Sequence, residues 1–346
     1  MLFPDVPQMR LVGIARLAAE SAPLQAKRSV GYSRLATRSL INRCSSPRMP
    51  FRWTINPYRG CEFACRYCYA RYTHEFMELR DPWDFERKIF AKAFDAAAFR
   101  AELARVPAHE EIAIGTATDP YQPAERRFGI TRSILSVLAE ERGRRLSLTT
   151  KSDLIRRDLG LLQRIARANV LAVNITITTL DEKLARLLEP LAPRPSLRLA
   201  AVRVLAGGGI AVGVLPNPIL PGLTDGEGNL DRVAEAAAQA GARWFGGGLV
   251  YLKPCAQAVF FPFLERHFPH LLDYYRRMFS HSAFVRGPYV AEMRRRLERI
   301  RARHGLGTAP IEYVPELAGE AQGELFVCEA ASQTLATGQG DCRMMA

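Results

Sequence analysis

Six short apolar runs alternate with amphipathic stretches between residues 51 and 255. Near-continuous apolar strands separated by helices of this size predict βαβ units and a parallel sheet. Six units fall short of the eight that close a barrel, so we expect an α/β fold, a partial (β/α)6 TIM-like barrel of parallel strands. The six predicted strands cover residues 52–56, 111–117, 146–150, 170–177, 210–217 and 243–252.

The segments on either side of this core have a different texture. Residues 1–50 are rich in Arg, Ser and Pro, so we expect an N-terminal extension that is irregular in part. After Cys255 the pattern becomes helical, and the last amphipathic stretch ends at Gly305, a candidate C-cap. The predicted organisation is an extension over 1–50, a core over 51–255, a C-terminal helical segment over 256–308 and a tail over 309–346.

Composition limits the compartment and the partners. No run approaches the roughly 20 apolar residues of a membrane span, and no apolar region follows a basic start at the N-terminus. A cytoplasmic location without a membrane partner is therefore expected. The net charge of +13 is compatible with a nucleic-acid partner. A solvated basic surface accounts for it more simply, since the charge is spread along the chain.

Three of the seven cysteines, Cys61, Cys65 and Cys68, fall within eight residues. In a reducing compartment such a cluster favours metal or redox chemistry over disulfides. Structural zinc normally takes four ligands, often from paired knuckles, and a second knuckle is absent here, although His74 is near. Iron–sulfur clusters usually take four thiolates, so three on a cubane leave one iron open to a substrate or cofactor.

The spacing C-x3-C-x2-C, with Tyr67 before the third cysteine and a strand before the loop, resembles the signature of the radical S-adenosylmethionine (SAM) superfamily. The stretches "TINPYRGCEFACRYCYARYTHEF", "DFERKIFAK", "AIGTATDPYQPAE", "LTTKS", "ITTLDEKLARLLEP" and "PNPILPGLTD" together resemble its spore-photoproduct-lyase-like branch. Within that branch they are similar to the group labelled DNA repair photolyase-like. The resemblance covers roughly residues 38 to 305.

The resemblance implies a set of cofactor contacts. Cys61, Cys65 and Cys68 would bind a [4Fe–4S] cluster, and the amino and carboxylate groups of SAM would take the fourth iron. An electron donor of the flavodoxin or ferredoxin type is implied as a partner. The resemblance assigns the remaining contacts to Tyr67 near the adenine, to Thr118 and Asp119 near the methionine amino group, to Lys151 lining the SAM site, and to Asn174 or Thr176 near the ribose.

Three of these residues could have ordinary structural roles instead. Asp119 precedes Pro120, and Asp-Pro is a common turn pair. Lys151 follows an apolar strand, where a surface lysine can extend its ammonium group into solvent. The ordinary alternative for Tyr67 is a packed core aromatic.

One feature of the branch is missing from this chain. Spore photoproduct lyase depends on a cysteine just after the second strand, and Thr116 occupies the nearest equivalent position. Repair of thymine photoproducts by that route is therefore not expected. Cys255 follows the sixth apolar run and is the candidate catalytic thiol, with a buried, inert cysteine as the alternative. Cys328 and Cys342 have a spacing that builds no familiar site, and the alternative is that they bind a second cluster together with Cys44.

Two functions from different classes fit the sequence. One is a radical SAM enzyme that cleaves SAM and abstracts hydrogen from an unknown substrate, with nucleic acid as a candidate. The other is a basic nucleic-acid-associated protein whose iron–sulfur cluster is structural or redox-sensing. A structural cluster would need a fourth protein ligand and would have no use for Lys151 and Tyr67 at the strand ends.

Overall fold

The structure, a computed structural model, describes residues 11–27, 29–47, 49–310 and 313–317. Its larger sheet has seven strands in the order β11-β10-β9-β8-β7-β4-β3, and six of them are parallel. The parallel strands are β4 (Trp53–Ile55), β7 (Glu111–Ile114), β8 (Arg145–Thr150), β9 (Val170–Thr176), β10 (Val212–Leu215) and β11 (Trp244–Phe245).

Each parallel strand overlaps one of the six predicted apolar runs, and β8 begins one residue before its run. The strands follow one another across the sheet in chain order, which is the arrangement of a partial (β/α)6 barrel and confirms the predicted fold class. The last run differs from the prediction because only Trp244–Phe245 pairs as a strand. Gly246–Gly248 interrupt it, and the chain then makes only single bridges, from Leu249 to Ile219 and from Tyr251 to Phe284.

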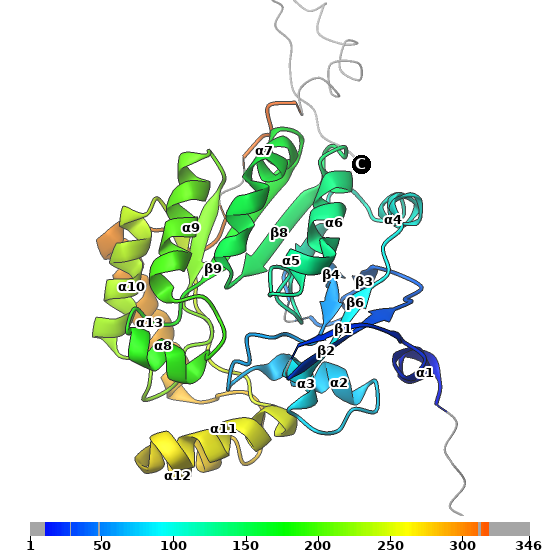
Figure 1. Ribbon diagram of the computed structural model, residues 1–346. Coiled ribbons are helices and arrows are strands. Elements are labelled where there is room, and N and C mark those ends of the chain that lie inside the picture. The colour runs from blue at the N-terminus through cyan, green and yellow to red at the C-terminus, as the bar shows by residue number, and fades with distance from the viewer. Residues whose placement is uncertain (1–10, 28, 48, 311–312, 318–346) are drawn as a thin grey trace, which may run out of the picture.

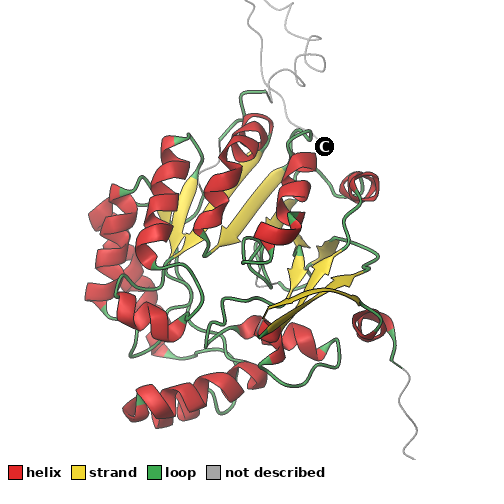
Figure 2. Ribbon diagram, viewed as in Figure 1, coloured by secondary structure: helices red, strands yellow, loops and turns green. Residues whose placement is uncertain are grey.

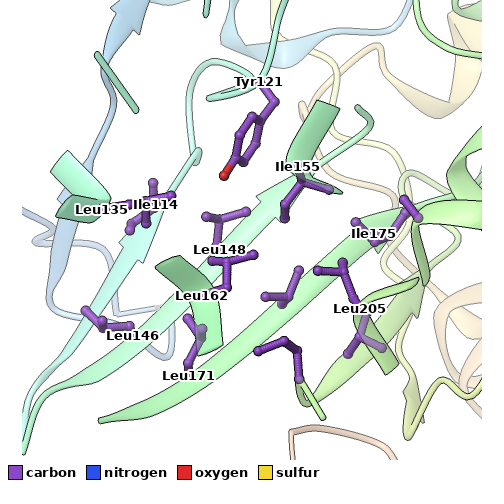
Figure 3. Close-up of a cluster of buried hydrophobic side chains, with 14 of the residues drawn as sticks. Ile114, Tyr121, Leu135, Leu146, Leu148, Ile155, Leu162, Leu171, Ile175 and Leu205 are labelled. Carbon is purple, nitrogen blue, oxygen red and sulfur yellow. The ribbon is translucent and has the colours of Figure 1, made fainter. Parts of the chain in front are cut away.

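Helices between these strands cover one face of the sheet, as α6, α7 and α9 do in Figure 1. The apolar sides of the helices pack on the sheet. Figure 3 shows Leu162 and Leu205 of the helices in one cluster with alternate strand residues such as Leu148 and Ile175. The helices between the strands are η1 (Tyr69–Arg71), α2 (Tyr72–Glu75), α3 (Asp84–Arg87), α4 (Ala96–Leu103), α5 (Glu125–Phe128), α6 (Ile130–Leu138), η2 (Asp153–Asp158), α7 (Leu159–Ala168), α8 (Glu182–Leu188), α9 (Pro195–Gly207) and α10 (Glu227–Gln239).

A second, smaller sheet lies beside the barrel (Figure 2). It has the order β1-β2-β6-β5, with β1 (Ala22–Lys27), β2 (Val30–Leu35), β5 (Tyr58–Arg59) and β6 (Lys88–Lys92). The helix α1 (Gly13–Ala19) precedes it, and β3 (Ile41–Arg43) pairs with β4 at the edge of the larger sheet. Residues 13–43 are thus more regular than expected, because their partner strand, β6, comes from beyond the cysteine loop.

The C-terminal segment is helical, as predicted. It contains α11 (Pro254–His267), α12 (Pro269–Met278) and α13 (Pro288–His304), which ends at Gly305 in the left-handed conformation expected of a C-cap. The predicted tail over 309–346 lies almost entirely outside the described residues. No helix among the described residues is long and apolar enough to cross a membrane.

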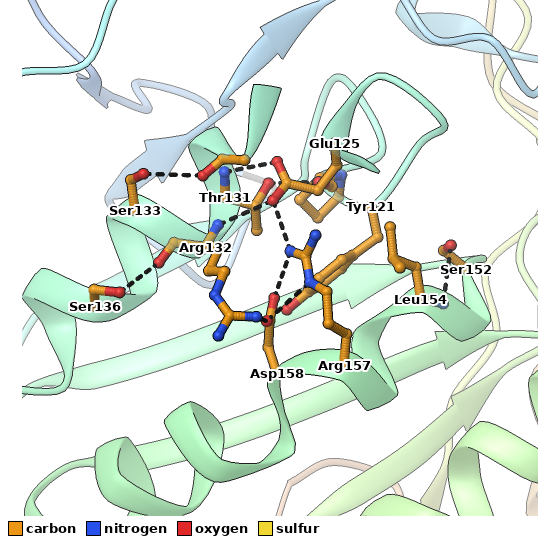
Figure 4. A network of polar contacts seen from close by, with 12 residues as sticks. Tyr121, Glu125, Thr131, Arg132, Ser133, Ser136, Ser152, Leu154, Arg157 and Asp158 are labelled. Atoms are coloured by element: carbon orange, nitrogen blue, oxygen red, sulfur yellow. Dashed lines mark hydrogen bonds and ion pairs between the residues drawn. The ribbon is translucent and has the colours of Figure 1, made fainter. Parts of the chain in front are cut away.

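A network of buried charges fastens the loop after β7 to the neighbouring helices (Figure 4). Glu125 accepts hydrogen bonds from the Tyr58 hydroxyl at 2.5 Å, from the Thr131 backbone at 2.8 Å and from Arg157 at 2.8 Å. Arg157 also pairs with the buried Asp158 at 2.8 Å. Because both of these carboxylates have partners, the network holds the strand end rigidly where the site is built.

The backbone of β10 lies very close to the ring of a tryptophan on β11. Gly213 lies under the Trp244 indole, and a Cβ there would come within 2.1 Å of ring atoms. The indole nitrogen donates a hydrogen bond of 2.9 Å to the side chain of Asn174 on β9. The interior of the barrel therefore depends on a glycine at this position.

Replacing Gly213 by Ala should lower the free energy of unfolding by at least about 2 kcal/mol, because the buried Trp244 ring has no room to move. Gly160→Ala on α7, where nothing lies within 4 Å of the added Cβ, should instead raise it by roughly 0.5–1 kcal/mol. Urea denaturation of the two variants at equal iron content measures both. Equal stability of the two variants would contradict the packing argument.

Candidate active site

The three-cysteine loop lies at the barrel mouth, the end of the larger sheet where the parallel strands have their carboxyl ends. Backbone hydrogen bonds fix it on two sides, from Cys61 to the Phe85 carbonyl at 2.9 Å and from Arg66 to the Leu188 carbonyl at 2.9 Å. A further bond of 3.2 Å from Cys68 to Cys65 closes the turn between them. The loop is therefore held by both the smaller sheet region and α8.

A tight approach behind the first cysteine reinforces this conformation. Gly60 has a φ of +81°, and a Cβ there would come within 2.7 Å of the Phe85 carbonyl oxygen. Only glycine fits such a position without moving the backbone. Ala64 also adopts a positive φ of 55°, unusual for a residue with a side chain, which turns the chain between the first two cysteines.

The donor set fits an iron–sulfur cluster better than a single ion. Among the described residues, no three His, Cys, Asp or Glu side chains converge on one metal ion. Yet the three thiols lie close enough for the charges of Cys65 and Cys68 to raise the pKa of Cys61. A four-iron cubane carries each thiolate on a different iron and so needs them near one another without sharing one centre.

Burial is the main reason that all three thiols have raised pKa values. Desolvation raises the pKa of Cys61 well above its usual range and that of Cys65 to about 12. For Cys68 desolvation is again the largest cause, and the charges of Arg71 and Lys151 oppose it. Binding of a cluster to these thiols must therefore release protons.

A buried carboxylate lies directly behind the loop. Glu189, fully buried just after α8, accepts a hydrogen bond from the Tyr67 hydroxyl and pairs with the buried Arg198 of α9 at 2.5 Å. Burial alone would raise the pKa of Glu189, but the charges of Arg198 and Lys151 outweigh it and hold that pKa below its usual value. Tyr67 is thus tied to the barrel through an ionised acid.

Lys151 lies in the same group, at the end of β8. Its ammonium nitrogen is 3.9 Å from Glu189, 3.4 Å from the Asn217 carbonyl oxygen and 5.8 Å from the centre of the Tyr67 ring. Its charge also lowers the pKa of both Cys65 and Cys68. The side chain is therefore turned into the site rather than out into solvent.

Thr118 and Asp119 make their contacts within the chain. The Thr118 hydroxyl donates to the Gly60 carbonyl at 2.6 Å. Asp119 accepts hydrogen bonds from the Thr150 hydroxyl at 2.6 Å and from the Lys151 backbone at 2.7 Å. These contacts join the loop after β7 to the cysteine loop and to the end of β8, so Asp119 fixes the position of Lys151.

Of the other predicted residues, Thr176 contacts this group through its carbonyl, which accepts a hydrogen bond of 3.1 Å from Arg198. Asn174 is in the middle of β9, bonded to Trp244 inside the barrel, and Thr176 is the strand's last residue. Cys255 lies in the first turn of α11. Burial and the nearby Glu75 carboxylate raise the pKa of its thiol to about 11, so the thiol is protonated at neutral pH.

Aromatic side chains extend from the mouth toward Cys255. Tyr69 donates a hydrogen bond to the Thr116 carbonyl at the end of β7 and lies 5.9 Å from Tyr251, measured between ring centres. Tyr251 stacks on Phe284 at 4.3 Å, and Lys253 lies 4.0 Å from the centre of the Tyr72 ring.

Cys44 contributes to the raised pKa of both Tyr69 and Tyr72, so it borders the same surface. Cys328 and Cys342 lie outside the described residues.

A partial barrel of parallel strands with a three-thiol loop and an ammonium group at its mouth defines a class of cofactor-dependent enzyme. The sequence model of the radical SAM superfamily matches residues 55–247, more than half of the chain. The chain therefore belongs to the radical SAM superfamily and is a radical SAM enzyme, and membership implies a [4Fe–4S] cluster and SAM.

Two relatives and one solved structure show how far the similarity extends. An uncharacterized protein of Mycobacterium tuberculosis H37Rv is 34% identical over 279 residues, 80% of this chain and 82% of its own length. An uncharacterized protein of Methanocaldococcus jannaschii is 29% identical over 178 residues, 51% of this chain and 63% of its own length. A spore photoproduct lyase with bound AdoMet and dinucleoside spore photoproduct shares the fold, with a TM-score of 0.59, 16% identity and 79% coverage of both chains.

Sequence reasoning missed Glu189 and Arg198. The only signal was a lone acid at the end of the quoted stretch "ITTLDEKLARLLEP", which is equally typical of an exposed helix terminus. A buried acid becomes recognisable only when its cation is placed beside it by the fold.

Replacing Glu189 by Gln should lower the free energy of unfolding by about 3–5 kcal/mol, because it leaves Arg198 buried without a counter-charge. The folded-state pKa of Glu189 lies below its ordinary 4.5. Its contribution is therefore complete above pH 4.5 and is lost as the pH falls through the lower folded value. Urea denaturation across this range measures the difference between wild type and variant.

The control is Glu182→Gln, an exposed acid at the start of α8, which should change the stability by less than about 0.5 kcal/mol. If Glu189→Gln were as mild as this control, the buried ion pair would not support the loop.

Proposed function

We propose that this protein cleaves SAM reductively at a cluster held by Cys61, Cys65 and Cys68 and uses the product to abstract hydrogen from a substrate. The observation that most directly supports this proposal is the convergence of Lys151 and Tyr67 on the cysteine loop. A cluster held by the three cysteines would supply one-electron reduction of SAM, the chemistry that cleaves a C–S bond to give methionine and a 5′-deoxyadenosyl radical. The loop's three cysteines leave the fourth cluster position to SAM.

The chain's own residues would bind SAM and orient it. Lys151 offers a cation to the carboxylate end of SAM, and Asp119 holds the backbone of Lys151 in place. Tyr67 would lie near the adenine and Thr118 and Asp119 near the methionine amino group. Asn174 or Thr176 would reach the ribose from inside the barrel. The buried loop keeps water from the site, which a reactive radical requires.

Cys255 is our candidate for the thiol that returns a hydrogen atom to the substrate. Its raised pKa of about 11 keeps the S–H bond intact at neutral pH. It enters from α11, whereas Thr116 stands at the strand position where the lyase carries its cysteine. The Thr116 O–H bond is too strong to donate hydrogen, so we do not assign thymine photoproduct repair by the lyase route.

The partners follow from this chemistry. A flavodoxin or ferredoxin would supply the electron. Nucleic acid is the candidate substrate, supported by the net charge of +13 and by exposed rings beside the mouth, Tyr69 and Phe284, each 39% exposed. A structural or redox-sensing cluster would need a fourth protein ligand, for which the loop offers none.

Cys65→Ala should abolish both iron binding and release of 5′-deoxyadenosine, because the cluster loses one of only three protein ligands. Iron analysis, EPR of the reduced protein and chromatography of 5′-deoxyadenosine measure this after anaerobic reconstitution. Cys44→Ala, which removes a thiol outside the loop, should retain both. Zinc in place of iron in the wild-type protein, or SAM cleavage by Cys65→Ala, would refute the proposal.

If nucleic acid is the substrate, single-stranded DNA or RNA should change the rate of SAM cleavage, and binding should weaken steeply with salt. Phe284→Ala should weaken binding by about 1–3 kcal/mol, the value of one stacked base. Leu191→Ala, an exposed apolar residue on the loop after α8, is the matched control and should have no effect. An unchanged cleavage rate across DNA and RNA would argue against a nucleic-acid substrate.

A further inference from the structure

A basic pocket of about 230 Å³ lies on the outer side of the cysteine loop, between α8 and α11. Arg66, Arg186, Arg266 and His267 line it, around an apolar surface that includes Trp83 and Phe263. No acidic side chain is among its lining residues in the described chain. The charged residues of the pocket are therefore all basic, and the rings of Trp83 and Phe263 lie beside them.

The cations of this pocket contact neutral groups, and Arg186 donates a hydrogen bond of 2.6 Å to the Pro190 carbonyl. The Arg66 guanidinium lies 5.6 Å from the centre of the Trp83 ring. The nearby buried Glu86 pairs with the buried Arg71 beneath, and it also interacts with the charge of Arg66. Arg186 and Arg266 are exposed on the surfaces of their helices. An anionic surface placed here would meet several cations at once.

The pocket is next to a cluster ligand. Arg66 lies between Cys65 and Cys68 in the chain. Trp83 is in contact with a second guanidinium, that of Arg71, at 5.8 Å from the ring centre. Arg71 in turn donates a hydrogen bond of 3.1 Å to the Cys65 carbonyl. Two contacts thus connect the pocket surface to the residue that would carry an iron of the cluster.

We propose that this pocket is the docking site for the electron donor, a small acidic redox protein of the flavodoxin type. The inference rests on the proposed function. Docking brings the donor's cofactor toward Trp83, and one electron passes to the cluster. The donor is oxidised by one electron and the cluster is reduced by one, with no bond made or broken in this step.

The chemistry of the pocket favours this occupant. Transient redox partners bury small interfaces and rely on charge complementarity for fast association. Nucleic acid would be expected at the mouth itself, which Tyr69, Tyr251 and Phe284 border. None of these mouth residues lines the basic pocket. Separate surfaces allow the donor to bind while a substrate occupies the mouth.

The test uses a double variant, Arg186→Glu/Arg266→Glu, in the reconstituted protein. Both side chains are exposed and outside the cysteine loop, so folding and iron content should be unchanged. The matched control is Arg203→Glu/Arg294→Glu, exposed arginines of α9 and α13 that do not line the pocket. Affinity for a purified flavodoxin is measured by calorimetry at low ionic strength, independently of any SAM cleavage.

The pocket variant should lose about tenfold or more in flavodoxin affinity, and the control about twofold or less. Reduction of the cluster by flavodoxin should slow in parallel, while reduction by methyl viologen radical, a small cation, should not. Equal flavodoxin affinity in the two variants would overturn the proposal. So would loss of affinity for single-stranded DNA in place of flavodoxin.

Failure of the proposed function would look different. In that case the wild-type protein would release no 5′-deoxyadenosine even with methyl viologen radical. The affinity comparison between the two double variants would still decide whether the pocket binds the donor.

Discussion

The buried carboxylate of Glu189 is the contact on which the site depends. It receives the Tyr67 hydroxyl from the cysteine loop, the Arg198 guanidinium from α9 and the charge of Lys151 from β8. One ionised group therefore connects three parts of the chain that are far apart in sequence. An acid buried this deeply is tolerated only because two cations compensate its lost hydration.

The same contact determines the charge at the mouth. Three thiolates and a buried acid would repel one another, and the positive charges of Lys151, Arg71 and Arg198 offset them. Lys151 is held in turn by Asp119, whose oxygens bind the end of β8 from the neighbouring loop. The barrel thus supplies rigid strand ends, and the polar network turns them into a site.

The barrel strands and the cysteine loop could be predicted because their signals are local. Apolar runs such as Leu146–Thr150 have strand periodicity, and three cysteines within eight residues favour a metal or cluster over any packing role. The smaller sheet could not be predicted, since β2 finds its parallel partner only after the loop, at Lys88–Lys92. Glu189 and Arg198 could not be predicted either. Their partners lie elsewhere in the chain, and neither residue differs in local sequence from an exposed helix residue.

The position of the last helices in the chain affects the order in which the site forms during synthesis. Cys61, Cys65 and Tyr67 pack in one apolar cluster with Val250 and Leu252, just before α11, and with Ala256 and Phe260 in α11. A ribosome releases the thiols nearly two hundred residues before it finishes the segment that covers them. The loop would therefore be open to cluster delivery during synthesis, and docking of α11 would close it afterwards. A chain truncated within α11 would lack this cover, so a cluster on the three thiols would be open to oxygen.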